Sequence, residues 1–176
     1  PRKYDCPNMA DFYVCKYSHK YTSEMIYALR QLKDIKKRKS LKVLSIGCGP
    51  CTELFALDYL KEAGKYKYEE IEFRGIDPLR DVWGNIHKEI KRYDNDVYAN
   101  KFFYKNIEEL IDTIIEVRWL PHLIVFQYIF SDMQKNTSRA EINRFINKLS
   151  EFVNNMMEYD TYIVLNDINL STRWGG

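Results

Sequence analysis

Five short apolar segments alternate with stretches of helical periodicity along this chain of 176 residues. Between the segments, apolar residues recur three and four positions apart, which is the spacing of an amphipathic helix. Strands that alternate with helices pair in parallel, with helices on both faces of the sheet and right-handed crossovers. The pattern therefore predicts a three-layer α/β fold with a doubly wound, mostly parallel sheet. The predicted strands are residues 41–46, 71–76, 101–104, 122–128 and 162–168.

Several predicted helices carry end signals. Helix 52–62 is followed by Gly64, a residue type that often ends helices. A second helix, 79–93, follows the second strand. Asn106, with Glu109 three positions later, predicts the N-cap of a third helix. These signals place the ends of the helices between the strands.

Two further helices flank this series. Ser138 and Glu141 form a capping-box pattern ahead of the longest helix, which reaches Met156. Before the first strand, apolar residues predict a helix that includes residues 21–32, and the residues up to about Phe12 look irregular. We expect this first helix to cap one end of the sheet.

Composition excludes some classes of protein. Hydrophobic residues make up 45% and charged residues 30% of the chain, as in globular proteins. No apolar run reaches the length of about 18 residues that could span a membrane, so we expect no membrane partner. The net charge of +2 is too small to indicate a nucleic-acid partner. Four cysteines without a secretory leader indicate reduced thiols and a cytoplasmic location.

The length fits one compact domain. Within it we distinguish an N-terminal helical cap with a basic linker, residues 1–40, from a sheet domain, residues 41–176. The chain begins at Pro1 without an initiator Met, which indicates a trimmed piece. We interpret the basic run near the boundary as a solvated linker, with a phosphate-binding patch as the alternative. The run comprises Lys33, Lys36, Lys37, Arg38, Lys39 and Lys42.

The turn after the first predicted strand holds the most informative residues. It reads Gly47-Cys48-Gly49-Pro50-Cys51 and leads into a helix. Glycines let the backbone approach a ligand closely, and a helix start offers unpaired N–H groups and a positive dipole end. Asp77 follows the second strand and Gln127 ends the fourth. The carboxyl ends of parallel strands meet at one edge of a sheet, so we predict a ligand site there.

These segments resemble the class I S-adenosylmethionine-dependent methyltransferases, whose sheet is Rossmann-like. Residues 43–51 are similar to the family's first motif, 75–77 to its second-strand acid, and 123–128 to its fourth strand. The resemblance covers about residues 21–169. It implies S-adenosylmethionine as cofactor and an unidentified methyl acceptor: a small molecule, a protein or RNA. The family's last two of seven strands are lacking, so we expect further sequence or a protein partner to complete the C-terminal end.

The resemblance also implies roles for individual residues. Asp77 is expected to accept hydrogen bonds from the ribose hydroxyls. An aromatic face at Tyr128, or at Tyr17 or Tyr21, would stabilise the sulfonium charge. Asn106 is as well explained by a helix cap as by a contact to adenine. The predicted cofactor-binding residues are Gly47, Cys48, Gly49, Pro50, Cys51, Asp77, Pro78, Asn106, Ile107, Gln127 and Tyr128.

Three positions depart from the family pattern. Ser45 stands where the family often has an acidic residue, and Cys51 where it often has a third glycine. Tyr128 occupies the place of the catalytic histidine of some small-molecule O-methyltransferases. No catalytic base is therefore assigned, although methyl transfer can rest on the alignment of the nucleophile with the methyl carbon.

Alternative functions remain open at the same turn. Cys48 and Cys51 spell Cys-Gly-Pro-Cys, the sequence of a thiol-disulfide redox turn. A nicotinamide-binding turn would need a third glycine where Thr52 stands. A third alternative is a non-catalytic partner protein that has kept the cofactor fold.

The N-terminal segment has a partial zinc-binding spacing. Cys6, Cys15 and His19 match part of a zinc finger, but a fourth ligand is missing. We therefore predict no metal site in this chain.

Overall fold

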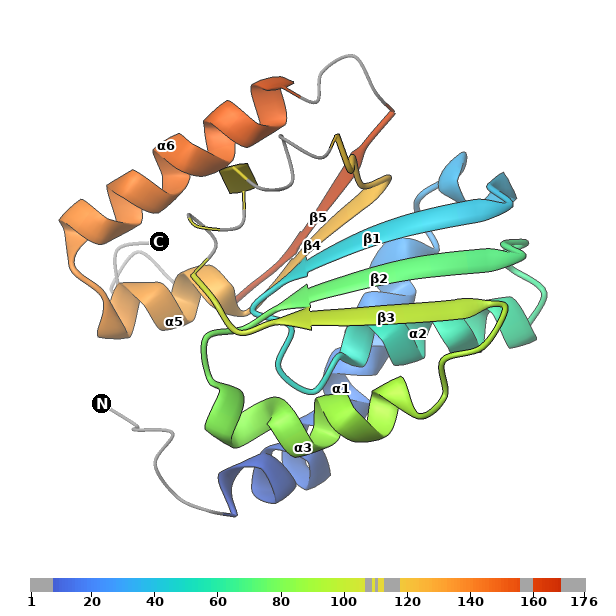
Figure 1. The fold of residues 1–176 in the computed structure, drawn as a ribbon, viewed down its shortest axis with the longest axis horizontal. Coiled ribbons are helices and arrows are strands. Elements are labelled where there is room, and N and C mark those ends of the chain that lie inside the picture. The colour runs from blue at the N-terminus through green and yellow to red at the C-terminus, as the bar shows by residue number, and fades with distance from the viewer. Residues whose placement is uncertain (1–7, 107–108, 110, 113–117, 156–159, 169–176) are drawn as a thin grey trace.

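The sheet that organises this protein is wholly parallel. The computed structural model describes residues 8–106, 109, 111–112, 118–155 and 160–168. Five strands pair in the order β3-β2-β1-β4-β5, and every neighbouring pair is parallel (Figure 1). The predicted Rossmann-like α/β fold is confirmed. The strands are β1 (Ser40–Ile46), β2 (Glu70–Ile76), β3 (Tyr98–Phe103), β4 (Leu123–Gln127) and β5 (Tyr162–Asn166).

Helices cover both faces of this sheet. Figure 1 shows α1, α2 and α3 together on one face and α6 on the other. A short 3-10 turn, Ile35–Lys37, leads into β1. In the described part of the chain, no helix has the length and apolar character needed to cross a membrane. The helices are α1 (Met9–Leu29), α2 (Thr52–Glu62), α3 (Arg80–Lys91), α5 (Ile129–Asn136) and α6 (Arg139–Asn155).

Two hydrophobic clusters fill the space between the layers. Val43 of β1 packs in the cluster that includes Met25 of α1 and residues of α2. The next residue, Leu44, belongs to the other cluster, with Phe145 and Phe152 of α6. Successive side chains of a strand point to opposite faces, so a strand buried on both faces is a nearly continuous apolar run. This explains why β4, which reads Leu-Ile-Val-Phe before Gln127, is a nearly continuous apolar run in the sequence.

The ends of several elements differ from the prediction: α1, for example, ends at Leu29 rather than at residue 32. Helix α1 begins at Met9, within the stretch that looked irregular, because its first turns pack through aromatic side chains such as Tyr13. Strand β3 begins at Tyr98 rather than at residue 101. Helix α5 was not predicted at all. The helix predicted after Asn106 falls largely outside the described residues.

The capping box at the start of α6 is confirmed. The backbone N–H of Glu141 donates to Ser138 Oγ at 3.3 Å, and the backbone N–H of Ser138 donates to Glu141 Oε2 at 3.0 Å. These reciprocal bonds satisfy donors that the first turn of a helix otherwise leaves unpaired.

Ser138→Ala is expected to lower the free energy of unfolding by about 1 kcal/mol, the usual cost of losing a helix N-cap side chain. Ser138→Thr keeps the hydroxyl and serves as the matched control, with a loss well below that of alanine. Urea unfolding followed by circular dichroism measures both. Equal losses in the two variants would show that the hydroxyl has no capping role.

Candidate functional site

A cavity of about 500 Å³ opens at the carboxyl edge of the sheet. Its lining includes the turn after β1 and the end of β4, the two neighbouring strands between which the order of the sheet reverses. Open α/β sheets bind ligands at this point, and the volume is that of a small-molecule site. The predicted residues that line the cavity are Gly47, Cys48, Gly49, Pro50, Asp77, Pro78, Asn106, Gln127 and Tyr128.

Two predicted site residues are not among these described lining residues. Ile107 lies outside the described residues. Cys51 lies behind the turn with none of its surface exposed. It precedes α2 in the left-handed conformation, with φ +60°, which glycine adopts without strain. This explains why related turns favour glycine at that position.

The turn itself is held against β2. The backbone N–H groups of Gly47 and Cys48 both donate to the carbonyl of Ile76, at 2.8 and 3.0 Å. Gly47 has φ +65° and Gly49 has φ +43°, both in the region that favours glycine. A Cβ at position 47 would also meet the side chain of Ile129 at 1.8 Å, so helix α5 packs on the turn. The glycines therefore serve both the backbone conformation and this close approach.

Asp77 is held in place by two backbone N–H groups. Its Oδ2 accepts the N–H of Gly49 at 3.1 Å, and its Oδ1 accepts the N–H of Leu79 at 2.9 Å. Burial raises the pKa of Asp77, and these two backbone N–H groups oppose that shift. Each carboxylate oxygen retains a free lone pair for a ligand donor. The carboxylate is thus oriented before any ligand arrives.

Glu53, in the first turn of α2, is a second buried acid at the cavity. It is 2% exposed, and its Oε1 has no hydrogen-bond partner among the described residues. Burial raises the pKa of Glu53 to about 7, and a hydrogen bond from Ser45 opposes the shift. A buried carboxylate oxygen without a partner is costly, and a cationic ligand would relieve that cost.

Glu53 is not among the residues predicted from the sequence. The available signal was Ser45, which stands where an acid was expected. Glu53 of α2 interacts with Ser45 of β1. Helix α2 therefore supplies a carboxylate beside the position in β1 where serine replaces the expected acid.

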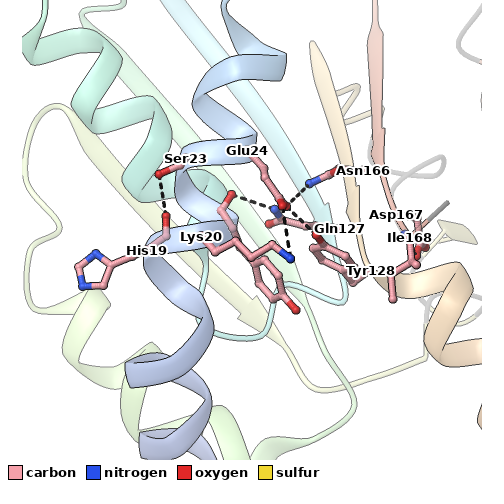
Figure 2. A network of polar contacts seen from close by, with 10 residues as sticks. His19, Lys20, Ser23, Glu24, Gln127, Tyr128, Asn166, Asp167 and Ile168 are labelled. Atoms are coloured by element: carbon pink, nitrogen blue, oxygen red, sulfur yellow. Dashed lines mark hydrogen bonds and ion pairs between the residues drawn. The ribbon is translucent and has the colours of Figure 1, made fainter.

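Helix α1 is fastened to the strand ends by a polar network around Glu24, shown in Figure 2. Glu24 Oε2 accepts hydrogen bonds from Tyr128 Oη at 2.7 Å and from Asn166 Nδ2 at 3.0 Å. Lys20 Nζ lies 3.7 Å from the other carboxylate oxygen. Tyr128 has φ +60°, an uncommon conformation for a bulky residue. These contacts attach α1 to the carboxyl ends of β4 and β5, where it was predicted to cap the sheet.

Gln127 joins the same cap to α2. Its Oε1 accepts a hydrogen bond from Thr52 Oγ1 at 2.7 Å, and its Nε2 donates to the carbonyl of Tyr21 at 3.0 Å. Both ends of this amide are thus engaged within the protein. The predicted contact between Gln127 and a cofactor stays a prediction.

Aromatic rings form one wall of the cavity. Tyr21 packs against Tyr128 with ring centroids 4.2 Å apart, and Tyr13 meets Trp83 edge-on at 5.4 Å. All four rings line the cavity. Tyr17 stacks on Tyr21 at 5.4 Å. Such faces are electron-rich and favour a cation nearby.

Glu24→Ala is expected to loosen α1, because Tyr128 and Asn166 lose their shared acceptor. Two lost hydrogen bonds to a charged group, at about 1.5–3 kcal/mol each, predict a decrease of about 3 kcal/mol in unfolding free energy, the lower end of the range because the Glu24 side chain is partly exposed. Glu62→Ala, at an exposed position near the end of α2, is the matched control. Urea unfolding and the rate of proteolysis within α1 measure the effect. Equal stability of the two variants would contradict a fastening role for Glu24.

The thiols of the turn are poorly placed for redox exchange. Cys48 is 4% exposed, Cys51 is fully buried, and burial raises the pKa of both thiols. Thiol-disulfide exchange needs an accessible thiolate. His87 of α3 lies beside them, with Nε2 3.7 Å from Cys48 Sγ and 2.7 Å from the carbonyl of Gly49. The geometry favours a ligand-binding turn over an oxidoreductase.

Charged residues that sequence analysis did not select also line the cavity. Asp132 comes from α5, the unpredicted helix, and its pKa is raised by burial. The others are Lys105, Glu141 and Arg144.

Comparison with known proteins finds similarity in fold. No family model and no curated protein matches this chain. Among solved structures, it is similar to a protein of Methanococcus maripaludis proposed to be an S-adenosyl-L-methionine-dependent methyltransferase. The identity is 14%, 86% of each chain is covered, and the TM-score is 0.47.

Two larger proteins show the same kind of similarity. MnmC2 from Aquifex aeolicus is 15% identical over 68% of this chain, with a TM-score of 0.37. The trans-methyltransferase CalH, in complex with S-adenosylhomocysteine, is 14% identical over 68% of this chain, with a TM-score of 0.35. This chain spans 39% of MnmC2 and 34% of CalH.

Proposed function

We propose that this protein binds S-adenosylmethionine and transfers its methyl group to an acceptor. The observation that carries the proposal is the Asp77 carboxylate, fixed by two backbone N–H groups at the edge of the cavity beside the glycine turn. A ribose presents two neighbouring hydroxyls, and an oriented carboxylate accepts both.

Residues of the cavity lining are also suited to the amino-acid end and the adenine of the cofactor. Glu53 would hold the ammonium group of its amino-acid end, since Oε1 of this carboxylate is buried without a partner. Pro78 and Asn106 line the same cavity as Asp77 and are the candidates for contact with adenine. These residues fit a ligand that is cationic at one end and a flat heterocycle at the other.

S-adenosylmethionine supplies an electrophilic methyl group on a sulfonium. The chain's part is to bind and align the reactants and to exclude water. The rings of Tyr21 and Tyr128 offer electron-rich faces beside the turn. Alignment alone can contribute much of the rate in such a displacement.

Calorimetry of the full chain with S-adenosylhomocysteine tests the proposal. We expect saturable binding of one ligand per chain and no comparable binding of NADH. Binding of NADH would instead favour the alternative of a nicotinamide-binding protein. Absence of S-adenosylhomocysteine binding would overturn the proposal.

Incubation of cell extract with methyl-labelled S-adenosylmethionine then identifies the acceptor as a small molecule, a protein or RNA. Cofactor binding without any labelled product would favour the alternative of a non-catalytic partner protein.

A further inference from the structure

Two sulfur atoms and a ring nitrogen lie close together at the turn after β1. Cys48 and Cys51 come from the turn after β1, and His87 comes from α3. Their ligand atoms all lie within 4.8 Å of one another. The three side chains are 4%, 0% and 1% exposed, respectively. Thiolate and imidazole groups are the preferred protein ligands of zinc, and two cysteines separated by two residues are a common zinc-binding spacing.

We propose that Cys48, Cys51 and His87 bind one zinc ion. The proposal concerns a different ligand from the methyl donor and does not rest on the proposed function. This corrects the prediction of no metal site, which considered only Cys6, Cys15 and His19. His87 is distant along the chain from the turn, and only the packing of α3 brings it to Cys48 and Cys51.

The charges of this set balance. Two thiolates and a neutral imidazole carry a net charge of −2, which one Zn²⁺ neutralises. A buried cluster of this kind therefore avoids the cost of an isolated buried ion. On binding, each thiol releases its proton to solvent, so two protons leave for each ion taken up. Three protein ligands leave one position of a tetrahedral ion for water.

The surroundings of His87 suit a metal ligand. Its Nδ1 lies 3.1 Å from Tyr104 Oη, and its ring stacks on Phe102 at a centroid distance of 4.1 Å. In the ion-free arrangement Nε2–H donates to the carbonyl of Gly49. When Nε2 binds the ion, its proton moves to Nδ1 and is donated to Tyr104. An outer partner of this kind orients a ligating imidazole.

The packing also leaves room for the sulfur and a route to it. A Cβ at Gly75 would lie 2.7 Å from Cys48 Sγ, so glycine in β2 makes space for this side chain. Cys48 lines the cavity, through which an ion can reach the cluster. Because the N–H of Gly49 donates to Asp77, an ion behind the turn would stiffen the loop that holds this acid.

Titration of the reduced, metal-free full chain with Co²⁺ tests the site, since cobalt replaces zinc and reports thiolate ligands by charge-transfer absorption. We expect one Co²⁺ per chain, displaced by Zn²⁺, with release of two protons. Cys48→Ser, Cys51→Ser and His87→Gln should each weaken binding by more than about a hundredfold, beyond the loss typical for an outer-shell partner alone. Cys15→Ser, at an exposed cysteine, is the control and should bind as the wild type.

The proposal is overturned if the wild type takes up no Co²⁺, or if the Cys48 and Cys51 variants bind it as tightly as the wild type. If the variants do not fold, a second measurement on the wild type alone still tests the site. Zn²⁺ should slow iodoacetamide alkylation of Cys48 and Cys51 and leave Cys15 unchanged, as read by peptide mass spectrometry. Under mildly denaturing conditions in which both thiols react measurably without metal, equal rates with and without Zn²⁺ would overturn the site. Cofactor binding by protein that takes up no metal would overturn the zinc site alone.

Discussion

Asp77→Ala is expected to weaken S-adenosylhomocysteine binding by at least about a hundredfold. The alanine variant loses the acceptor for the ribose hydroxyls, and hydrogen bonds to a charged group contribute about 1.5–3 kcal/mol each. Since 1.4 kcal/mol is a factor of ten in affinity, two such bonds account for the expected loss. The N–H groups of Gly49 and Leu79 also lose their acceptor, so the turn itself loosens. Isothermal calorimetry on both proteins measures the effect.

Two controls separate ligand binding from the fold. Asp77→Asn keeps the shape of the side chain and one carbonyl acceptor, so its loss should lie between those of the wild type and the alanine variant. Asp81→Ala removes an exposed acid of α3 and should leave affinity unchanged. An Asp77→Ala protein that is folded by circular dichroism and binds within about threefold of the wild type would rule out the ribose role.

Glu53→Gln is expected to weaken S-adenosylhomocysteine binding by roughly ten- to a hundredfold, the equivalent of about 1.5–3 kcal/mol for a charge-assisted bond. Methylthioadenosine lacks the amino-acid end of the ligand and should bind the variant and the wild type alike. Glu62→Gln, at the opposite end of the same helix, is the matched control. If both ligands weaken equally in Glu53→Gln, the carboxylate acts on the cavity as a whole and does not bind the ammonium group.

The pH dependence of binding gives a second signature of Glu53. Its pKa is about 7 in the free protein, so below that pH the side chain must lose a proton before it pairs with an ammonium group. Affinity of the wild type for S-adenosylhomocysteine should therefore rise from pH 6 to pH 8 more steeply than that of Glu53→Gln. Parallel pH profiles for the two proteins would contradict the assignment.

Stability is expected to change with pH in the opposite sense. Glu53 has a pKa near its ordinary value of 4.5 when unfolded and about 7 when folded, so the folded state binds the proton more tightly. Between these values, rising pH should lower the unfolding free energy of the wild type relative to Glu53→Gln. Thermal unfolding of the two proteins across this range measures the difference.

The parts of this molecule that were predictable depend on short stretches of sequence. The apolar strands, the glycine turn and the acid that directly follows β2 can be recognised in the sequence. Each is a local feature, formed by residues that are close together along the chain. The turn residues 47–50 and Asp77 accordingly line the cavity together.

The parts that were missed depend on which elements meet. In the sequence Glu53 is an ordinary residue of a predicted helix, and only the structure shows that it interacts with Ser45. His87 likewise becomes a neighbour of the turn only through the packing of α3. Helix α5 is too short for a periodic signal, and Ile129 packs against Gly47, a contact that no local pattern specifies. The first turns of α1 use aromatic contacts in place of an aliphatic stripe.

Docking of the α1 cap would also be coupled to occupancy of the cavity by the proposed ligand. Gln127 and Tyr128 hold this helix with the same side chains that line the cavity. Equilibria that share residues influence each other reciprocally: if a bound ligand tightens the docking of α1 by some factor, a tighter α1 raises ligand affinity by that same factor. Substitutions on the outer surface of α1, remote from any reacting atom, should therefore change the affinity of the cavity for its ligand.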